Sequence, residues 1–374
     1  MVNVSLVDNN EKAINVYENS QGNRITLFSV YKCYISGSKV GLKLIISCAY
    51  KFLNVRNVSI RLESNTFANN TLETFGFYKE HTCYYSTTPR QVFIDAVNNT
   101  FILNKKSVIH IDCPGIFALQ GTLASNAFLD NLGKVVTVRE GTNCGDRHKY
   151  PIKIQITSNR FENNTGQYMV NIDLQPWYTI RSAVLRHNSF VMNKQTKLPS
   201  RFYSRMTEDA VIVLKEGTFH ILQNSFENPN FNYQVAAALA AHGRVVNASH
   251  NWWATVDECR IKSQMFDYED RLDLARIEYF PFLESNYSHN AVSLNSSRPS
   301  CFLKDMAIGG TLDRHLQLNT TTTAYIVTAD IVILPSGSLD IKSNVTLKFP
   351  ARSAFVVQGS LKVYGKKEET VKFT

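Results

Sequence analysis

Residues 158–161 read Ser158-Asn159-Arg160-Phe161, an asparagine followed two positions later by an aromatic residue. This motif returns along much of the chain. Its seven asparagines are Asn65, Asn99, Asn126, Asn159, Asn188, Asn224 and Asn251. They are separated by 27 to 36 residues. A repeat of variable length around a fixed motif is typical of a solenoid, in which each unit packs only on its neighbours.

Polarity alternates in the residues that precede the motif, as in Ile152-Lys153-Ile154-Gln155-Ile156. A period of two is typical of half-buried strands. A second short apolar run usually follows the motif, and no unit carries the apolar stripe of an amphipathic helix. Short strands, polar corners and about thirty residues per turn favour coils stacked at ~4.8 Å. We therefore predict an all-β chain that folds as a right-handed parallel β-helix, a solenoid of the pectin-lyase type.

The motif itself suggests a structural role. Asparagine tolerates the left-handed backbone conformation of a sharp corner, and its amide both donates and accepts hydrogen bonds. The same asparagine on successive coils is expected to form a ladder along the axis, with the aromatic residues stacked inside. These aromatic residues are Phe67, Phe101, Phe128, Phe161, Phe190, Phe226 and Trp253. The alternative, that the motif is merely common in an asparagine-rich chain, is disfavoured by its regular spacing beside strands.

Four regions are expected along the chain. Residues 1–253 are predicted to form the coils, and the first ~50 to be truncated or irregular because they lack the motif. Residues 254–283 are predicted to form a short helical cap, residues 284–300 a polar linker, and residues 301–374 the start of a second, incomplete β-helix block punctuated by turn residues.

The helical cap is predicted from a change of period after Trp253. Thr255-Val256-Asp257-Glu258 has the form of a capping box, and Ile261 and Met265 recur at helical spacing. Such a helix would cover the open end of the solenoid, whose last coil otherwise exposes unpaired strand edges.

Composition and charge bound the function. The chain is 44% hydrophobic and 19% charged, so it can bury a large core. Its net charge of +9 allows an acidic glycan, nucleic acid or an anionic membrane as partner. Lysine and arginine are scattered, which excludes a nucleic-acid footprint and favours a solvated surface, with a glycan partner as the lesser alternative.

N-glycosylation acceptor sequences indicate a secreted chain. Besides Asn3, they occur at Asn57, Asn69, Asn98, Asn163, Asn247, Asn286, Asn295, Asn319 and Asn344. No run reaches the ~18 apolar residues of a transmembrane helix, and the first twenty residues lack the pattern of a signal peptide. We therefore expect a membrane anchor outside this fragment.

The seven cysteines are also consistent with a secreted chain. They are Cys33, Cys48, Cys83, Cys113, Cys144, Cys259 and Cys301, with no zinc-binding spacing. In a secreted chain they are expected to form about three disulfides and to leave one thiol over. Buried thiols of a cytosolic protein are the alternative, which the acceptor sequences disfavour.

Many parallel β-helices cleave polysaccharides, which requires acids clustered on one face. Acids on neighbouring coils should then occupy equivalent positions relative to the motif. Asp95 lies four residues before Asn99, but the equivalent residues elsewhere are not acidic, and no acid column is expected. The remaining acids at unmatched offsets are Asp112, Asp130, Asp173 and Asp209.

Two other groups of residues are candidates for a site. Asp267, Glu269, Asp270 and Asp273 could do acid–base work or hold calcium, but they lack the spacing of a calcium loop and are interpreted as a solvated helix end. His187 and His250 each precede a motif asparagine and are interpreted as corner residues rather than metal ligands. We therefore predict neither a catalytic site nor a metal or cofactor.

The ordered motifs resemble those of the bark beetle family over most of residues 51–374. The residues that carry the resemblance are the motif coils, His250-Asn251-Trp252-Trp253, Phe266-Asp267-Tyr268, Ile277-Glu278-Tyr279-Phe280-Pro281-Phe282-Leu283, Gly309-Gly310-Thr311-Leu312 and Leu334-Pro335-Ser336-Gly337-Ser338-Leu339. The family implies a large animal cell-surface protein with tandem β-helix repeats, scavenger-receptor and C-type-lectin-like modules, one membrane span, and a role at septate junctions and cell corners of epithelia.

Together, these features favour a non-enzymatic extracellular scaffold or adhesion segment at an epithelial cell junction. Expected partners are junction or cell-surface proteins, including a second copy of the chain, and glycans. A secreted polysaccharide lyase or hydrolase and a glycan-binding β-helix without turnover remain as alternatives, which activity on acidic glycans and glycan arrays would separate.

Overall fold

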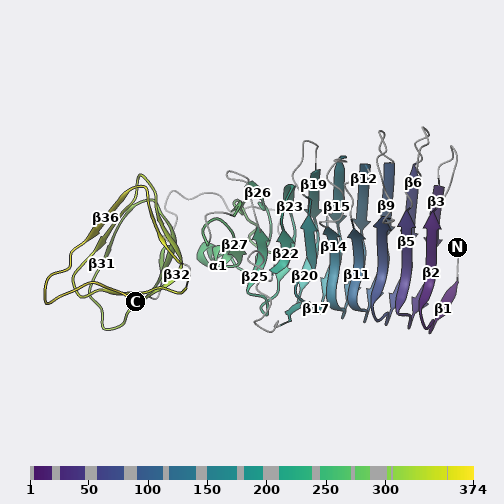
Figure 1. Cartoon of the computed structure of the whole chain (residues 1–374), viewed down its shortest axis with the longest axis horizontal. Helices are drawn as coiled ribbons and strands as arrows, with labels where there is room; N and C mark the ends of the chain where they lie inside the picture. The colour runs from purple at the N-terminus through teal and green to yellow at the C-terminus, as the bar shows by residue number, and fades with distance from the viewer. Residues whose placement is uncertain are drawn as a thin grey trace.

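A computed structural model of the chain (Figure 1) describes residues 4–18, 26–46, 57–79, 91–112, 118–139, 150–174, 181–196, 210–237, 245–270, 274–286, 301–304, 306–351 and 353–374. All structural statements below refer to these residues. The prediction of an all-β chain with parallel sheets is confirmed, and the arrangement is consistent with a β-helix or solenoid. No described helix is long and apolar enough to cross a membrane.

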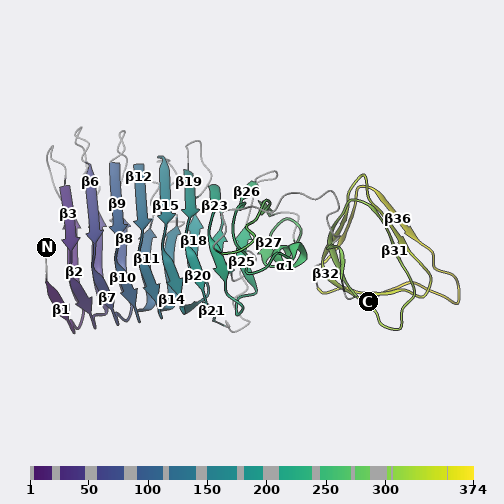
Figure 2. The ribbon, with the colours of Figure 1, turned by 180° about the vertical axis from the view of Figure 1, so that it is seen from behind.

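Three parallel sheets run along the N-terminal part of the chain (Figures 1 and 2). The first sheet contains short strands in the order β1 (Ser5–Val7), β4 (Tyr34–Ser36), β7 (Thr66–Ala68), β10 (Thr100–Ile102), β13 (Ala127–Leu129), β16 (Arg160–Glu162), β20 (Ser189–Val191) and β24 (Ser225–Glu227).

The second sheet contains β2 (Lys12–Glu18), β5 (Val40–Ile46), β8 (Glu73–Lys79), β11 (Lys105–Asp112), β14 (Leu132–Arg139), β18 (Val170–Asp173), β22 (Ala210–Leu214), β25 (Tyr233–Ala237) and β27 (Met265–Phe266), with β17 (Thr165–Gly166) and β21 (Lys194–Gln195) beside them. The third sheet contains β3 (Thr26–Tyr31), β6 (Val58–Glu63), β9 (Gln91–Val97), β12 (Ala118–Ala124), β15 (Ile152–Thr157), β19 (Arg181–Arg186), β23 (Thr218–Leu222), β26 (Val245–Asn247) and β28 (Arg276–Glu278).

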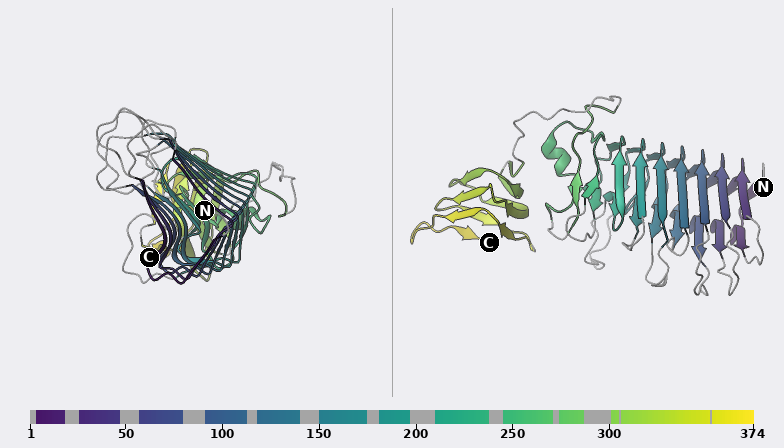
Figure 3. Two further views of the ribbon diagram at one scale, coloured as in Figure 1. Left: turned by 90° about the vertical axis from the view of Figure 1, so that its right-hand side faces the viewer. Right: turned by 90° about the horizontal axis from the view of Figure 1, so that it is seen from above.

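The chain visits the three sheets in turn, and each round of third, first and second sheet is called a coil. β15 shows why these residues form strands: Ile152, Ile154 and Ile156 are buried, whereas Lys153 and Gln155 are exposed. Seen along the axis, the three sheets enclose a common interior (Figure 3), where one hydrophobic cluster extends from Ile14 to Phe282.

The described residues among the first fifty, 4–18 and 26–46, are more regular than predicted. Strands β1 to β5 pair in parallel with the coils that follow them. Cys33 takes the place of the motif asparagine, since its backbone N–H donates to Asn65 Oδ1 over 2.9 Å, and Ile35 pairs with Phe67. The expectation of an irregular start was wrong because these two substitutions hide the motif.

The corner geometry also differs from the expectation. The left-handed residue is the one before each motif asparagine, as at Ser158, whose φ is 56°. Ser64, Asn98, Ser125, His187, Gln223 and His250 have φ between 55° and 57°. The asparagine itself does not adopt the left-handed conformation. Its place in the motif is therefore determined by its hydrogen bonds.

The single described helix, α1 (Glu258–Lys262), follows the last coil. Its N-cap is Asp257, whose side chain accepts from the N–H groups of Cys259 and Arg260 over 3.0 and 3.3 Å. The predicted capping box placed the N-cap residue at Thr255. The Thr255 hydroxyl instead accepts a hydrogen bond from the backbone N–H of Asp257. The helix is shorter than the predicted period implied, because Met265 belongs to β27.

The C-terminal part contains two further sheets and a separate hydrophobic cluster. One sheet is formed by β29 (Leu303–Lys304), β30 (Ala307–Leu312), β32 (Tyr325–Ile333), β34 (Thr346–Lys348) and β37 (Lys372–Phe373), with β35 (Phe355–Val357) beside β32. The other is formed by β31 (His315–Leu318), β33 (Ser338–Ile341) and β36 (Ser360–Val363). All pairings are parallel except that of β29 with β30. Most of the predicted linker, residues 287–300, lies outside the described residues.

Candidate functional site

The structure places the seven predicted asparagines in one column through successive coils. Asn159 is representative: its Nδ2 donates to Asn188 Oδ1 over 3.0 Å and to the Leu123 carbonyl over 2.8 Å. Its Oδ1 accepts from Nδ2 and from the backbone N–H of Asn126, over 3.0 and 2.9 Å. The column links Asn65, Asn99, Asn126, Asn159, Asn188, Asn224 and Asn251, each at most 2% exposed.

The predicted aromatic residues form a parallel stack beside this column. Centroids of successive rings lie 4.6 to 5.2 Å apart, and the ring planes differ by 2° to 12°. The stack runs from Phe67 to Trp253, and all seven side chains are buried. Such offset stacking adds to the burial of the rings as a source of stability.

A second asparagine column was missed by the sequence analysis. It consists of Asn70, Asn104, Asn131, Asn164, Asn193 and Asn228, with Nδ2–Oδ1 distances of 2.8 to 3.0 Å. Five of the six lie five residues after a motif asparagine, and this offset was a signal that could have revealed the column. Gln234 extends it, because its Oε1 accepts from Asn228 Nδ2 over 2.9 Å.

The glycosylation candidates divide by exposure. Asn69, Asn98 and Asn163 are exposed left-handed corner residues, each directly before a buried column asparagine. Asn286, Asn319 and Asn344 are also exposed, whereas Asn57 and Asn247 are half-buried. Asn3 and Asn295 lie outside the described residues. His187 and His250 likewise are exposed corner residues, and the described residues contain no group of three or more potential metal ligands.

A charged row, in which no two acids lie on neighbouring coils, crosses the second sheet. We define it as Asp112, Arg139, Asp173 and Lys215. Register places Asp112 opposite Arg139 and Arg139 opposite Asp173. Arg139 Nε lies 3.5 Å from Asp112 Oδ1, and Lys215 Nζ lies 3.7 Å from Asp173 Oδ2. Acids and bases therefore alternate along the row.

Counting residues from the motif asparagine did not predict the charged row, because the coils differ in length. Asp112 and Arg139 each lie thirteen residues after their motif asparagine, but Asp173 lies fourteen after Asn159. The extra residue falls between β17 and β18, where the second sheet is interrupted. Asp130 is instead at an exposed corner, and Asp209 lies outside the described residues.

Titratable groups near the row are shifted by burial. Burial raises the pKa of Asp173, and the Lys215 and Arg139 cations oppose the shift. Burial also raises the pKa of Glu73, to which the Tyr78 hydroxyl donates a hydrogen bond. His110, packed on the Tyr78 ring at 5.4 Å, has its pKa lowered to about 4 by burial, so it is neutral at physiological pH.

Asp267 of the cap is buried and Glu269 and Asp270 are half-buried, so the interpretation of these acids as a solvated helix end was wrong for Asp267. Asp267 is 8% exposed and accepts from the N–H groups of Glu269 and Ile277 over 2.9 and 2.8 Å. Burial raises the pKa of Asp267 to about 6 and that of Asp270 to about 7. Glu269 forms an ion pair with Lys262. Asp273 lies outside the described residues.

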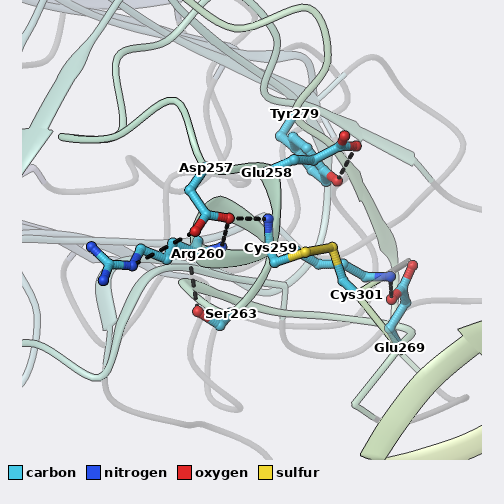
Figure 4. The surroundings of a disulfide bond; sticks show 9 residues. Asp257, Glu258, Cys259, Arg260, Ser263, Glu269, Tyr279 and Cys301 are labelled. Atoms are coloured by element: carbon cyan, nitrogen blue, oxygen red, sulfur yellow. Dashed lines mark hydrogen bonds and ion pairs between the residues drawn. A yellow bond between two sulfur atoms is a disulfide. The ribbon is translucent and has the colours of Figure 1, made fainter. Parts of the chain in front are cut away.

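One disulfide joins Cys259 of α1 to Cys301, with Cα atoms 5.1 Å apart (Figure 4). Cys33 is a buried free thiol. The other cysteines, Cys48, Cys83, Cys113 and Cys144, lie outside the described residues. Beside the disulfide, an open cleft of about 410 Å³ is lined by residues of the cap and of the C-terminal sheets.

Comparison with known proteins gives one clear relative. No protein-family profile matches the chain, and no solved structure is significantly similar to it. Protein bark beetle of Drosophila melanogaster is 26% identical over 340 residues, which cover 85% of this chain and 11% of that relative. The predicted resemblance is confirmed: the chain is related to Protein bark beetle, through a segment that makes up about a tenth of that longer protein.

Proposed function

We propose that the chain is a non-enzymatic extracellular scaffold or adhesion segment that acts at epithelial junctions of the septate or tricellular type. In this proposal the coils form a right-handed parallel β-helix of the pectin-lyase type, and the C-terminal sheets begin a second one. The partners are junction or cell-surface proteins, including a second copy of the chain.

The two asparagine columns carry the proposal. They run through consecutive coils with the aromatic stack beside them, so every coil is joined to its neighbours by buried hydrogen bonds as well as by strand pairing. A structure held this way resists bending along its whole length, which is what a spacer between cells requires. Eight strands in the first sheet at ~4.8 Å give a rod of about 34 Å, so several such blocks would be needed to span an intercellular gap.

The relationship to Protein bark beetle supports the junction part of the proposal. Exposed acceptor asparagines at the corners support the extracellular part, because N-glycans are added to surface sites of secreted chains. A bead assay tests adhesion: beads coated with folded chain are expected to cluster, or to retain junction proteins from surface-labelled epithelial cells. Folded protein that does neither contradicts the proposal.

The charged row supports a second candidate, an enzyme or binding protein for acidic glycans. Its two carboxylates, the adjacent Arg139 and the neutral His110 are groups that a polysaccharide lyase could use. Against it, each carboxylate is already next to a cation within 3.5 to 3.7 Å. Cleavage of an acidic glycan that is lost in Asp173→Asn and kept in Asp95→Asn, on the third sheet, would favour the enzyme. A glycan array would reveal binding without turnover.

A further inference from the structure

The first block, the coils with their cap, and the second block, the C-terminal sheets, have separate cores. The hydrophobic cluster of the first block ends with Phe282, and that of the second begins with Phe302. No residue belongs to both clusters. Apolar packing among the described residues therefore does not join the two blocks into one body, and their relative orientation has to depend on other contacts.

The disulfide is attached to a rigid element on each side. Cys259 lies in α1, whose N-terminus is capped by Asp257 and whose Ile261 is fully buried in the first core. The Tyr279 hydroxyl donates to the Glu258 carboxylate over 3.1 Å, a second contact that holds the helix (Figure 4). Cys301 directly precedes Phe302, which is 2% exposed in the second core and whose carbonyl accepts from Gly309 N–H over 3.0 Å.

Among the described residues, an ion pair and an open cleft lie where the two blocks meet. Gly310 of the second block faces the Lys262–Glu269 ion pair of the cap: a Cβ there would lie 3.2 Å from the Glu269 carboxylate and 3.8 Å from the Lys262 ammonium. The cleft beside this contact has a mixed lining. Arg276 and Glu278 of the first block and Thr311, Asp313 and Arg314 of the second are polar, and Met265, Ile277, Phe280 and Leu334 are apolar. An interface with an open cleft and no shared apolar core ordinarily permits motion between domains.

We propose that the Cys259–Cys301 disulfide is a lock that fixes the angle between the first and second blocks, and that without it the junction is a hinge. The cross-link joins Cys259, two residues before the buried Ile261, to Cys301, directly before the buried Phe302, so it couples the orientation of one core to that of the other. The ion pair and the cleft alone leave that orientation free. The proposal does not depend on the adhesion role and holds for any function of the chain.

Single-molecule energy transfer between dyes on the two blocks tests the lock. Dyes are attached through noncanonical amino acids at Gln155, exposed on the third sheet, and at Lys366, exposed in the second block. The wild-type chain is expected to give one narrow distance peak, and the double variant Cys259→Ser, Cys301→Ser a peak at least about twofold broader. Ser263→Ala, on the same side of the cap but outside the cross-link, is the matched control and should keep the narrow peak.

Two further measurements separate hinge motion from unfolding. Amide hydrogen exchange in β23 and β33 should be unchanged in the double variant, which shows that both blocks are still folded. The comparison is also made on folded wild-type chain before and after reduction with a water-soluble phosphine, so the result does not depend on folding of the variant. A peak that stays narrow after the disulfide has been removed, by mutation or by reduction, overturns the proposal.

Discussion

Substitution of Asn159 by alanine provides the sharpest test of the asparagine column. Asn159 is 1% exposed and lies in the middle of the column. The substitution removes the acceptor for the backbone N–H and for Nδ2 of Asn126, and the donor to the Leu123 carbonyl. Asn188 Oδ1 also loses the Nδ2 donor, so four buried polar groups lose a partner in one step.

Each buried group left without a partner costs about 1 to 3 kcal/mol, so Asn159→Ala should lower the free energy of unfolding by at least about 3 kcal/mol. That is a large share of the roughly 5 to 15 kcal/mol that holds a typical domain together. Gln155→Ala, in the strand that precedes Asn159, is the matched control, because Gln155 is exposed and its substitution should change stability by less than about 0.5 kcal/mol.

Urea unfolding followed by circular dichroism measures both variants on one scale. Because long repeat arrays can depart from two-state unfolding, the midpoints should be compared together with hydrogen exchange in β12, β15 and β19. The expected loss of protection is centred on these strands, which flank the altered coil. A difference between Asn159→Ala and Gln155→Ala below about 1 kcal/mol would refute the reasoning, because it would mean that the column is not a source of stability.

The remaining predictions concern the stack, the cap and the charged row. Phe161→Ala should lower the free energy of unfolding by about 3 to 5 kcal/mol, because it leaves a cavity between the two neighbouring rings. Calorimetry measures this loss, and Phe161→Leu, which leaves a smaller cavity, serves as the milder comparison. Burial raises the pKa of Asp267 from 3.8 to about 6. The stability that the protonated carboxyl group contributes is therefore full below pH 4 and is lost as the pH rises through 6. Hydrogen exchange at Ile277, corrected for the intrinsic rate, should accelerate over this interval, and constant protection would contradict the prediction. Arg139→Ala should raise the pKa of Asp173 further, because one of the two cations that oppose the shift is removed. Titration of the Asp173 carboxyl group by nuclear magnetic resonance measures this pKa. An unchanged pKa would exclude an electrostatic coupling between Arg139 and Asp173.

The sequence predicted those features that repeat with constant chemistry. Asn159 and Phe161 recur at a fixed distance from one another, and both the column and the stack could be read from that spacing. The regularity of the first coils could not be predicted because Cys33 supplies only its backbone N–H to the column, a contact that any residue except proline can make. A search for repeats that requires the asparagine side chain cannot find such a coil.

Other features depend on information that one sequence does not contain. The alignment of Asp112 with Asp173 required knowledge of one extra residue between β17 and β18, which shifts the count from the motif by one. The left-handed corner at Ser158 rather than at Asn159 follows from the backbone path, since both residue types tolerate such corners. Pairing of Cys259 with Cys301 could not be chosen among seven cysteines by spacing alone.

The two asparagine columns also determine where the chain can change its length. Successive members of the first column are 34, 27, 33 and 29 residues apart up to Asn188, and the second column shows the same four separations up to Asn193. The segment between the columns therefore keeps one length while the rest of each coil varies. An insertion between Asn126 and Asn131 would break both columns at once, whereas one between Asn131 and Asn159 would leave them intact. Evolution and protein engineering can thus lengthen or shorten that variable part without disturbing either column.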